Sequence, residues 1–273
     1  MRTWVNGTIV ESAEALVSAY DHGLTVGDGV FETARVVDGV PFALTRHLER
    51  LAVSARGLTL PDPDLDLVRH AVEDTLREND TSAPMRLRIT YTGGISPLGS
   101  DRGQNAPTLI VAVAPLPAWP PSAAVATVPW PRNERAATAG LKTTSYADNV
   151  VALAYAHERG ADEAIFANTV GDLCEGTGSN VFLVLDGELV TPPLSSGCLA
   201  GVTRALLLEW TGAQERQLPL SALAEADEVF ISSSTRDVQP VHAVDGRALA
   251  APGPVTAGAA EAFASRAAAE LDP

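Results

Sequence analysis

Short alternations of apolar and polar residues run through the first half of the chain, a pattern typical of β-strands. Two of the four strand segments are expected to be hairpins, because their Asn-Gly and Asp-Gly dipeptides suit the positive φ of a tight turn. The segments are residues 3–12 with a turn at Asn6-Gly7, 30–44 with a turn at Asp38-Gly39, 85–92 and 108–116.

Apolar residues spaced three and four apart predict two helices in the same half. Thr45 is expected to cap the first helix, which runs to about Arg56 and stops at Gly57. Arg50 points away from the apolar stripe of this helix, so periodicity places it toward solvent unless that face borders a ligand cleft. The second helix follows a turn at 61–64 and carries Val68, Ala71, Val72 and Leu76 on its apolar face.

A proline-rich segment, residues 115–123, separates this half from the next. We therefore expect an α+β fold of two domains, 1–117 and 125–273, joined by a linker at 118–124, with a ligand cleft between them. The second domain is expected to hold helices at 146–159, 202–212 and 256–271, and strands at 125–130, 161–168, 180–193 and 228–233. A third hairpin turn is expected at Asp186-Gly187, within the 180–193 segment.

Charge and composition narrow the range of partners. The 273 residues carry a formal net charge of -15, which disfavours nucleic acid and anionic membranes, so an anionic ligand must be held locally. Only two cysteines occur, Cys174 and Cys198, too few for a disulfide framework or a Cys-rich zinc site, and we expect no metal. The N-terminus has no apolar signal segment, and the expected location is the cytoplasm.

Two segments could bind an anion without carrying charge. Gly201 precedes a helix whose first amides, those of Val202 and Thr203, have no intrahelical acceptor and suit a phosphate. A strand also runs into four consecutive hydroxyl residues, 232–235. Taken alone, each segment is equally consistent with an ordinary turn or a polar loop.

Lys142 is the only lysine of the chain, whereas all other basic residues are arginine. An amine can be deprotonated and can form a Schiff base, which a guanidinium cannot do. The alternative is an exposed lysine without a function. Glu175 lies between a turn and a strand of small residues, and it is either a surface charge or a pocket carboxylate for a protonated ring nitrogen.

These segments together resemble the class IV, or fold-type IV, aminotransferases that use pyridoxal 5'-phosphate (PLP). This family includes branched-chain and D-amino acid aminotransferases, R-selective amine transaminases and aminodeoxychorismate lyases. The resemblance spans nearly the whole chain, in family order, through residues 21–39, 47–51, 141–153, 162–184, 199–204 and 234–241.

The resemblance implies a role for each matching residue. Lys142 resembles the Schiff-base lysine, and Glu175 resembles the partner of the pyridine nitrogen. Tyr146 resembles the tyrosine at the cofactor's 3'-oxygen, and Asn180 a residue that supports the ring. The implied phosphate ligands are Arg50, Ser234 and the amides of Val202 and Thr203.

The substrate side is less specific in the sequence. Arg88 and Thr235 are the expected substrate ligands, and Arg86, Arg102, His22 and Arg236 are further candidates near the pocket. The main expected function is amino transfer between an amino acid or amine and a keto acid. The alternatives are aminodeoxychorismate lyase, which makes 4-aminobenzoate and pyruvate, and a non-catalytic PLP- or phosphate-binding module. The family also implies a homodimer.

Overall fold

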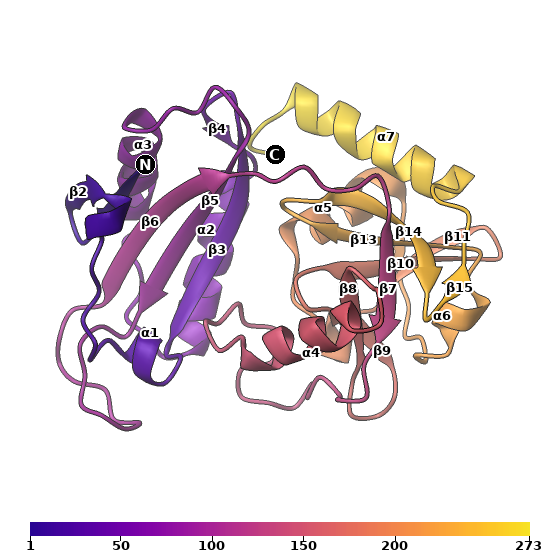
Figure 1. The fold of residues 1–273 in the computed structure, drawn as a ribbon, viewed down its shortest axis with the longest axis horizontal. Coiled ribbons are helices and arrows are strands. Elements are labelled where there is room, and N and C mark those ends of the chain that lie inside the picture. The colour runs from indigo at the N-terminus through magenta and orange to yellow at the C-terminus, as the bar shows by residue number, and fades with distance from the viewer. The chain divides into compact units, whose positions relative to one another are not determined.

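A computed structural model describes all residues, 1–273, as two compact units (Figure 1). Unit 1 comprises residues 1–117, 141–146 and 271–273, and unit 2 comprises 118–140 and 147–270. Segment 141–146, which the sequence analysis assigned to the second domain, therefore packs with the first unit. The predicted boundaries of the two domains, 1–117 and 125–273, remain a prediction.

Unit 1 contains one antiparallel sheet of six strands in the order β2-β1-β6-β5-β3-β4. The Asn6-Gly7 and Asp38-Gly39 turns connect neighbouring strands with positive φ at both residues, as predicted. The strands are β1 (Arg2–Val5), β2 (Thr8–Glu11), β3 (Gly29–Val37), β4 (Val40–Pro41), β5 (Met85–Thr92) and β6 (Thr108–Pro115).

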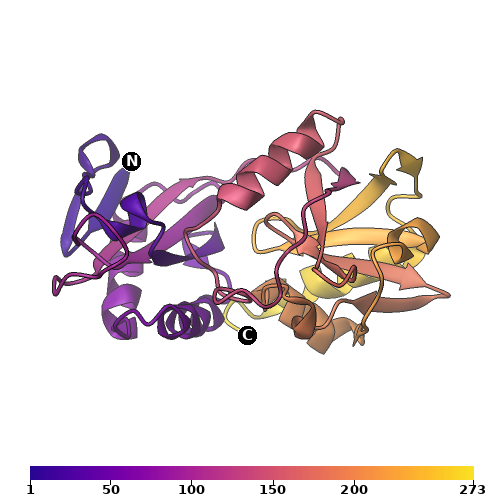
Figure 2. The same cartoon turned by 90° about the horizontal axis from the view of Figure 1, so that it is seen from below.

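Helices α2 (Leu44–Gly57) and α3 (Leu65–Arg77) cover one face of this sheet (Figure 2). Their apolar stripes meet the inward residues of β3, β5 and β6 in the core of the unit, which includes Leu48, Leu51, Val72, Leu87 and Val111. Two short elements precede β3, the 3₁₀ turn η1 (Ser12–Glu14) and α1 (His22–Thr25). On the opposite face, the N-cap residue of α1, Asp21, accepts hydrogen bonds from the Thr92 and Thr108 hydroxyls, both at 2.7 Å.

The cap of α2 differs from the prediction. The N-cap residue is Ala43 in a left-handed conformation, and no side chain of the helix caps it. Instead, the carboxylate of Asp272 accepts the Thr45 N–H at 2.8 Å and the Thr45 hydroxyl at 2.6 Å. A carboxylate near the chain's C-terminus thus satisfies the helix, a long-range contact that local sequence rules do not predict.

Unit 2 contains a nine-stranded mixed sheet, with the main path β12-β11-β10-β13-β14-β7-β8-β9 and β15 paired to β14. The predicted Asp186-Gly187 turn joins β10 and β11. The strands are β7 (Ala123–Thr127), β8 (Glu163–Ala167), β9 (Leu173–Gly176), β10 (Asn180–Leu185), β11 (Glu188–Thr191), β12 (Gln214–Glu215), β13 (Glu228–Ser233), β14 (Asp237–Val244) and β15 (Arg247–Ala248).

Three longer helices support this sheet. Helix α4 (Ala147–His157) packs on β7 and β8, while α5 (Val202–Thr211) and α7 (Pro254–Ala269) pack on each other and on β13. All three were predicted within two residues at each end. The short elements are η2 (Leu194–Ser196) and α6 (Ala222–Glu225). Cys174 and Cys198 are buried free thiols, and no helix is long and apolar enough to cross a bilayer.

Candidate active site

Lys142 lies in a segment that backbone hydrogen bonds hold against β3. Its carbonyl accepts the Phe31 N–H at 3.0 Å, and two residues later the Thr144 N–H donates to Gly29 at 2.8 Å. The Lys142 N–H lies 3.2 Å from the buried Ser54 hydroxyl on α2. Three anchors therefore fix the backbone of the chain's only lysine.

The Lys142 amine projects against two aromatic rings. Its Nζ lies 4.4 Å from the centroid of Phe31 and 6.0 Å from that of Tyr146. The two rings meet edge to face at 5.1 Å. The rings define the wall beside the amine and limit the positions that it can reach.

Behind Phe31, the next residue of β3 is a buried carboxylate. Glu32 receives two hydrogen bonds from Arg50, from Nε at 2.8 Å and from Nη2 at 2.7 Å, and a third from His47 Nδ1 at 2.6 Å. Burial alone raises the pKa of Glu32, but the charge and hydrogen bonds of Arg50 and His47 lower it to about 2. Glu32 is therefore a permanent anion between α2 and the sheet.

His47 completes this arrangement as a neutral base. Burial lowers its pKa, and the positive charges of Arg50 and Lys142 lower it further against the opposing effect of Glu32. Arg50, placed by periodicity on the polar side of α2, is thus mostly buried and bidentate with Glu32 rather than turned to solvent. We call Phe31, Glu32, His47, Arg50, Lys142 and Tyr146 the lysine cluster.

A second cluster lies in unit 2 around Glu175, on β9. Its Oε2 accepts the Leu199 N–H at 2.9 Å, and its Oε1 lies 3.3 Å from Arg132 Nε. The Arg132 guanidinium in turn stacks 4.2 Å from the centroid of Phe166. Glu175 is thus a mostly buried carboxylate paired with Arg132, not a surface charge.

The loop before α5 is held from both sides. Asn180 Nδ2 donates to the Leu199 carbonyl at 2.9 Å. The backbone of Leu199 is therefore bound at both groups, its carbonyl by Asn180 and its N–H by Glu175. A Cβ on Gly201 would lie 2.0 Å from Asn180 Oδ1, so only glycine fits as the N-cap. No side chain caps α5, and the N–H groups of Val202 and Thr203 have no acceptor within the helix.

One hydroxyl of the predicted 232–235 run, that of Ser232, lies on the strand next to Asn180. Ser232 is the cross-strand partner of Asn180, and its buried Oγ has no hydrogen-bond partner. Ser234 and Thr235 follow in the turn between β13 and β14. We call Arg132, Glu175, Asn180, residues 199–203 and Ser232 the Glu175 cluster.

A further buried carboxylate shapes the loop after Glu175. Glu163 accepts the N–H and the hydroxyl of Thr177 and lies 3.2 Å from the Ser179 hydroxyl. The predicted rim residue Arg236 approaches Glu163 at 4.0 Å and stacks on Trp119 at 3.6 Å. Glu163 therefore fixes the strand-to-strand loop that precedes Asn180.

Two other candidates have structural partners. Arg102 forms a bidentate ion pair with Asp28 at 2.6 and 2.5 Å and also donates to the Thr59 carbonyl at 2.6 Å. His22 is buried, with Nδ1 3.3 Å from Asp28 and Nε2 3.0 Å from the Pro97 carbonyl. Both residues hold the 93–105 loop against the rest of unit 1.

The predicted site residues divide between the two units. Arg50, Arg88, Lys142 and Tyr146 lie in unit 1, and the others lie in unit 2: Glu175, Asn180, Val202, Thr203, Ser234 and Thr235. Sequence reasoning missed Glu32, His47 and Arg132. The available signal was a lone acid in the apolar run of β3 and a histidine three residues before Arg50 on α2.

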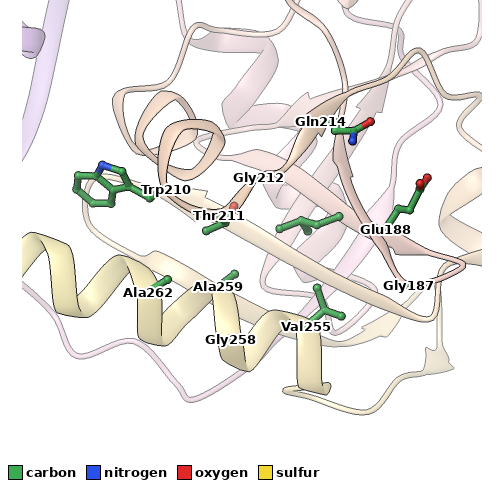
Figure 3. Close-up of a pocket in the computed structure, with 11 residues that line it drawn as sticks. Gly187, Glu188, Trp210, Thr211, Gly212, Gln214, Val255, Gly258, Ala259 and Ala262 are labelled. Carbon is green, nitrogen blue, oxygen red and sulfur yellow. The ribbon is translucent and has the colours of Figure 1, made fainter.

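A hollow of about 490 Å³ elsewhere in unit 2 includes none of these residues (Figure 3). It lies between the end of α5, the β10–β11 turn and α7, and small side chains and Trp210 line it. Its one charged group, Glu188, is paired with Arg216. A wall without convergent polar groups is unsuited to an anionic cofactor.

Comparisons with known proteins identify the family of the chain. The model of the family described as amino-transferase class IV matches residues 29–244. The chain belongs to this family. It is therefore an aminotransferase of a family whose cofactor is PLP, and the predicted fold-type IV architecture is confirmed.

The names of individual relatives mention more than one kind of substrate. A putative branched-chain-amino-acid aminotransferase of Methanocaldococcus jannaschii is 33% identical over 91% of this chain and 90% of its own length. A bifunctional aminodeoxychorismate lyase / D-amino acid transaminase of Mycobacterium tuberculosis is 34% identical over 90% and 91%. The PLP-bound structure of a hypothetical aminotransferase from Mycobacterium tuberculosis has a TM-score of 0.88 at 31% identity, covering 97% of this chain and 98% of that one.

Proposed function

We propose that this class IV aminotransferase moves an amino group between an amino acid or amine and a keto acid, with Lys142 as its catalytic residue. The observation that carries the proposal is the amine of the only lysine, held by three backbone contacts against two aromatic rings. No other lysine can take this role.

The residues of both clusters fit PLP. Its phosphate suits the uncapped start of α5, where the Val202 and Thr203 amides, the unpartnered Ser232 hydroxyl and the missing Cβ of Gly201 leave donors without acceptors. Ser234 and Arg50 are further ligands in this proposal. Because Glu32 already takes two N–H groups of Arg50, the guanidinium is oriented before any ligand binds.

Glu175 is suited to the ring nitrogen. Bound PLP supplies an electron sink for a carbanion at the substrate Cα, and a carboxylate keeps the ring nitrogen protonated for this purpose. The Leu199 N–H orients one oxygen of Glu175. We assign Asn180 to the support of the ring and the Tyr146 hydroxyl to the cofactor's 3'-oxygen.

Lys142 then performs the proton transfer. The Lys142 amine would act as the base that takes a proton from the substrate Cα and returns it to the C4' carbon of the cofactor. Its fixed backbone keeps the amine on one side of the flat cofactor, so the transfer is confined to one face. Phe31 and Tyr146 restrict access of water to the same side.

The single lysine allows a direct test. Borohydride reduction of the holoenzyme should attach the cofactor to Lys142 and thereby block tryptic cleavage after it, which joins residues 136–142 and 143–159 into one peptide. Mass spectrometry of the digest reads out this peptide. An adduct on the N-terminal amine alone would contradict the assignment.

Aminodeoxychorismate lyase is the second candidate, because the Mycobacterium tuberculosis relative is named for both activities. The two reactions use the same lysine and cofactor. Incubation with aminodeoxychorismate, compared with D- and L-amino acids and chiral amines plus a keto acid, separates them. Release of 4-aminobenzoate without any amino transfer would replace our main proposal.

We also propose a homodimer in the cytoplasm. Residues 15–26 and the 93–98 loop are joined by backbone hydrogen bonds, from His22 to Gly94 and from Ser96 to Tyr20. Together they expose Leu16, Val17, Tyr20, Leu24, Val26, Ile95 and Leu98, an apolar surface suited to a second copy of the chain. Sedimentation of Leu98→Asp against wild type tests this, and an active wild-type monomer would contradict it.

A further inference from the structure

The guanidinium of Arg132 contacts two cross-strand neighbours in unit 2. Glu175 on β9 is the direct partner of Phe166 on β8. The guanidinium stacks on the Phe166 ring, 4.2 Å from its centroid, and its Nε lies 3.3 Å from Glu175 Oε1. One side chain therefore combines an aromatic contact and an ion pair at adjacent positions of the sheet.

The backbone around Arg132 is fixed independently of this ion pair. The Arg132 N–H donates to the Ala167 carbonyl at 2.7 Å, and Arg132 forms a parallel bridge with Asn168. Two residues later, Glu134 accepts the N–H of Thr169 at 3.0 Å and its hydroxyl at 2.7 Å. The segment is thus tied to residues 167–169 at two points, and these contacts hold Arg132 beside Glu175.

Two thiols also lie near Glu175. Burial raises the pKa of Cys174 and Cys198, and the negative charge of Glu175 raises both further. Both thiols are therefore neutral at working pH. Neither adds a negative charge that would offset the effect of Arg132 on Glu175.

A carboxylate beside a ring nitrogen can share one proton with it in two ways. The proton lies on the nitrogen and both groups are charged, or it lies on the carboxyl oxygen and both are neutral. Burial favours the neutral arrangement, whereas a positive charge 3.3 Å from the carboxylate favours the charged one. An opposite charge this close favours an ionised carboxyl by a factor of about 10 to 1000.

We propose that Arg132 is a positioning residue that keeps the proton shared by Glu175 and the cofactor's ring nitrogen on the nitrogen. It acts through Glu175 and not by touching the cofactor. This inference rests on the function proposed above, including the assignment of Glu175 to the ring nitrogen, and deepens it by naming the group that maintains the electron sink.

The first test reads the ring nitrogen itself. PLP with an isotopically labelled ring nitrogen is bound to wild type, Arg132→Gln and Arg132→Lys, and its nitrogen NMR shift reports whether the nitrogen carries the proton. The wild-type nitrogen should be protonated, and Arg132→Gln should move its signal toward that of the neutral ring. Arg132→Lys retains a positive charge and should recover most of the wild-type signal. Equal signals for wild type and Arg132→Gln would overturn the role of Arg132.

The lysine variant separates charge from packing. If Arg132→Lys behaved like Arg132→Gln, the contact with Phe166 rather than the charge would matter, and the proposal would fail. Circular dichroism checks that each variant folds. Arg132→Met, which keeps an apolar contact with Phe166, takes the place of Arg132→Gln if the glutamine variant does not fold.

A double-variant cycle then tests whether Arg132 acts through Glu175. Arg132→Gln should slow conversion of the cofactor in a single turnover about 10- to 100-fold and change the substrate KM less than about threefold. In a Glu175→Gln background, the same substitution should add less than about threefold, because the group that it acts through is gone. An undiminished loss in the double variant would overturn the proposal.

Arg159→Gln is the matched control. This arginine also stacks on an aromatic ring, 3.3 Å from the centroid of Tyr155, and pairs with neighbouring Glu158. Its replacement should change neither the nitrogen signal nor the single-turnover rate. Wild type that binds no PLP, or transfers no amino group from any donor, would instead overturn the proposed function.

Discussion

The lysine cluster and the Glu175 cluster are built from different kinds of group. In the lysine cluster, full charges on Glu32, Arg50 and Lys142 lie beside a buried neutral histidine. In the Glu175 cluster, the ion pair of Glu175 with Arg132 is accompanied by uncharged groups: the Leu199 N–H on Glu175, the Asn180 amide on the Leu199 carbonyl, and the unpartnered Ser232 hydroxyl. Charged networks depend on every partner, whereas aligned dipoles share their effect among several groups. Single substitutions should therefore be more damaging in the first cluster.

The largest effect is expected at Lys142. Lys142→Ala removes the amine that holds the cofactor and moves the proton, and turnover should fall by at least about 10⁴-fold. Lys142→Arg keeps the charge but cannot be deprotonated, so it should be equally inactive. Steady-state assays of both variants, with circular dichroism as the folding control, check this. Turnover by Lys142→Arg near the wild-type rate would show that another group is the base.

Glu32→Gln should have the next largest effect, on stability rather than on chemistry alone. It leaves Arg50 buried without its anionic partner, which typically costs about 3–5 kcal/mol of unfolding free energy. Glu78→Gln is the control, since its ion pair with Arg2 is exposed and should contribute less than about 1 kcal/mol. Urea unfolding measures both variants. Equal unfolding free energies of the two variants would mean that the buried network contributes no more stability than an exposed ion pair.

The same network should make the protein sensitive to acid. The unfolded chain takes up a proton on Glu32 near pH 4.5, but the folded chain does so only near pH 2, so stability is lost as the pH falls through this window. His47, with its pKa lowered from 6.5, begins the loss at higher pH because the unfolded state protonates first. The slope of stability against pH below 4.5 should be smaller in Glu32→Gln than in wild type.

Sequence patterns found the Glu175 cluster more completely than the lysine cluster, for a physical reason. Gly201 before a helix and the hydroxyl run at 232–235 are local signals, and their backbone consequences follow directly from turn and helix chemistry. The pairing of Glu32 with Arg50 joins a strand to a helix and depends on tertiary packing. Periodicity therefore placed Arg50 toward solvent, although the buried carboxylate draws it inward.

For the fold too, local elements could be predicted from the sequence, whereas contacts between distant residues could not. Strands β5 and β13 begin and end where the alternating and apolar runs do, and three Asx-Gly turns lie where expected. The cap of α2 was wrong because Asp272 is distant in sequence. Strand β7 begins at Ala123, inside the segment read as a linker, because proline content alone does not mark where pairing resumes.

Glu175→Gln tests the Glu175 cluster at its carboxylate. A neutral amide stabilises a protonated ring nitrogen far less than a carboxylate does, so conversion of the cofactor in a single turnover should slow about 100-fold. Folding should be retained, because Gln can still accept the Leu199 N–H. Stopped-flow absorbance gives the rate. A rate within about tenfold of wild type would remove Glu175 from the ring nitrogen.

The smallest effect is expected at Ser232, where the difference between the clusters is sharpest. Its Oγ is one of several uncharged donors beside the start of α5, and one such hydrogen bond contributes about 0.5–1.5 kcal/mol. Ser232→Ala should therefore weaken cofactor binding only about 2- to 13-fold. Arg50→Ala should weaken it more and should also lower stability, because it leaves Glu32 with fewer partners.

Equilibrium dialysis gives the cofactor dissociation constants and thermal unfolding gives the melting temperatures of both variants. Ser221→Ala, at an exposed position before α6, is the matched control. If Ser232→Ala released the cofactor as completely as Arg50→Ala did, the phosphate would depend on one hydroxyl rather than on a shared set of dipoles, and the contrast between the two clusters would fail.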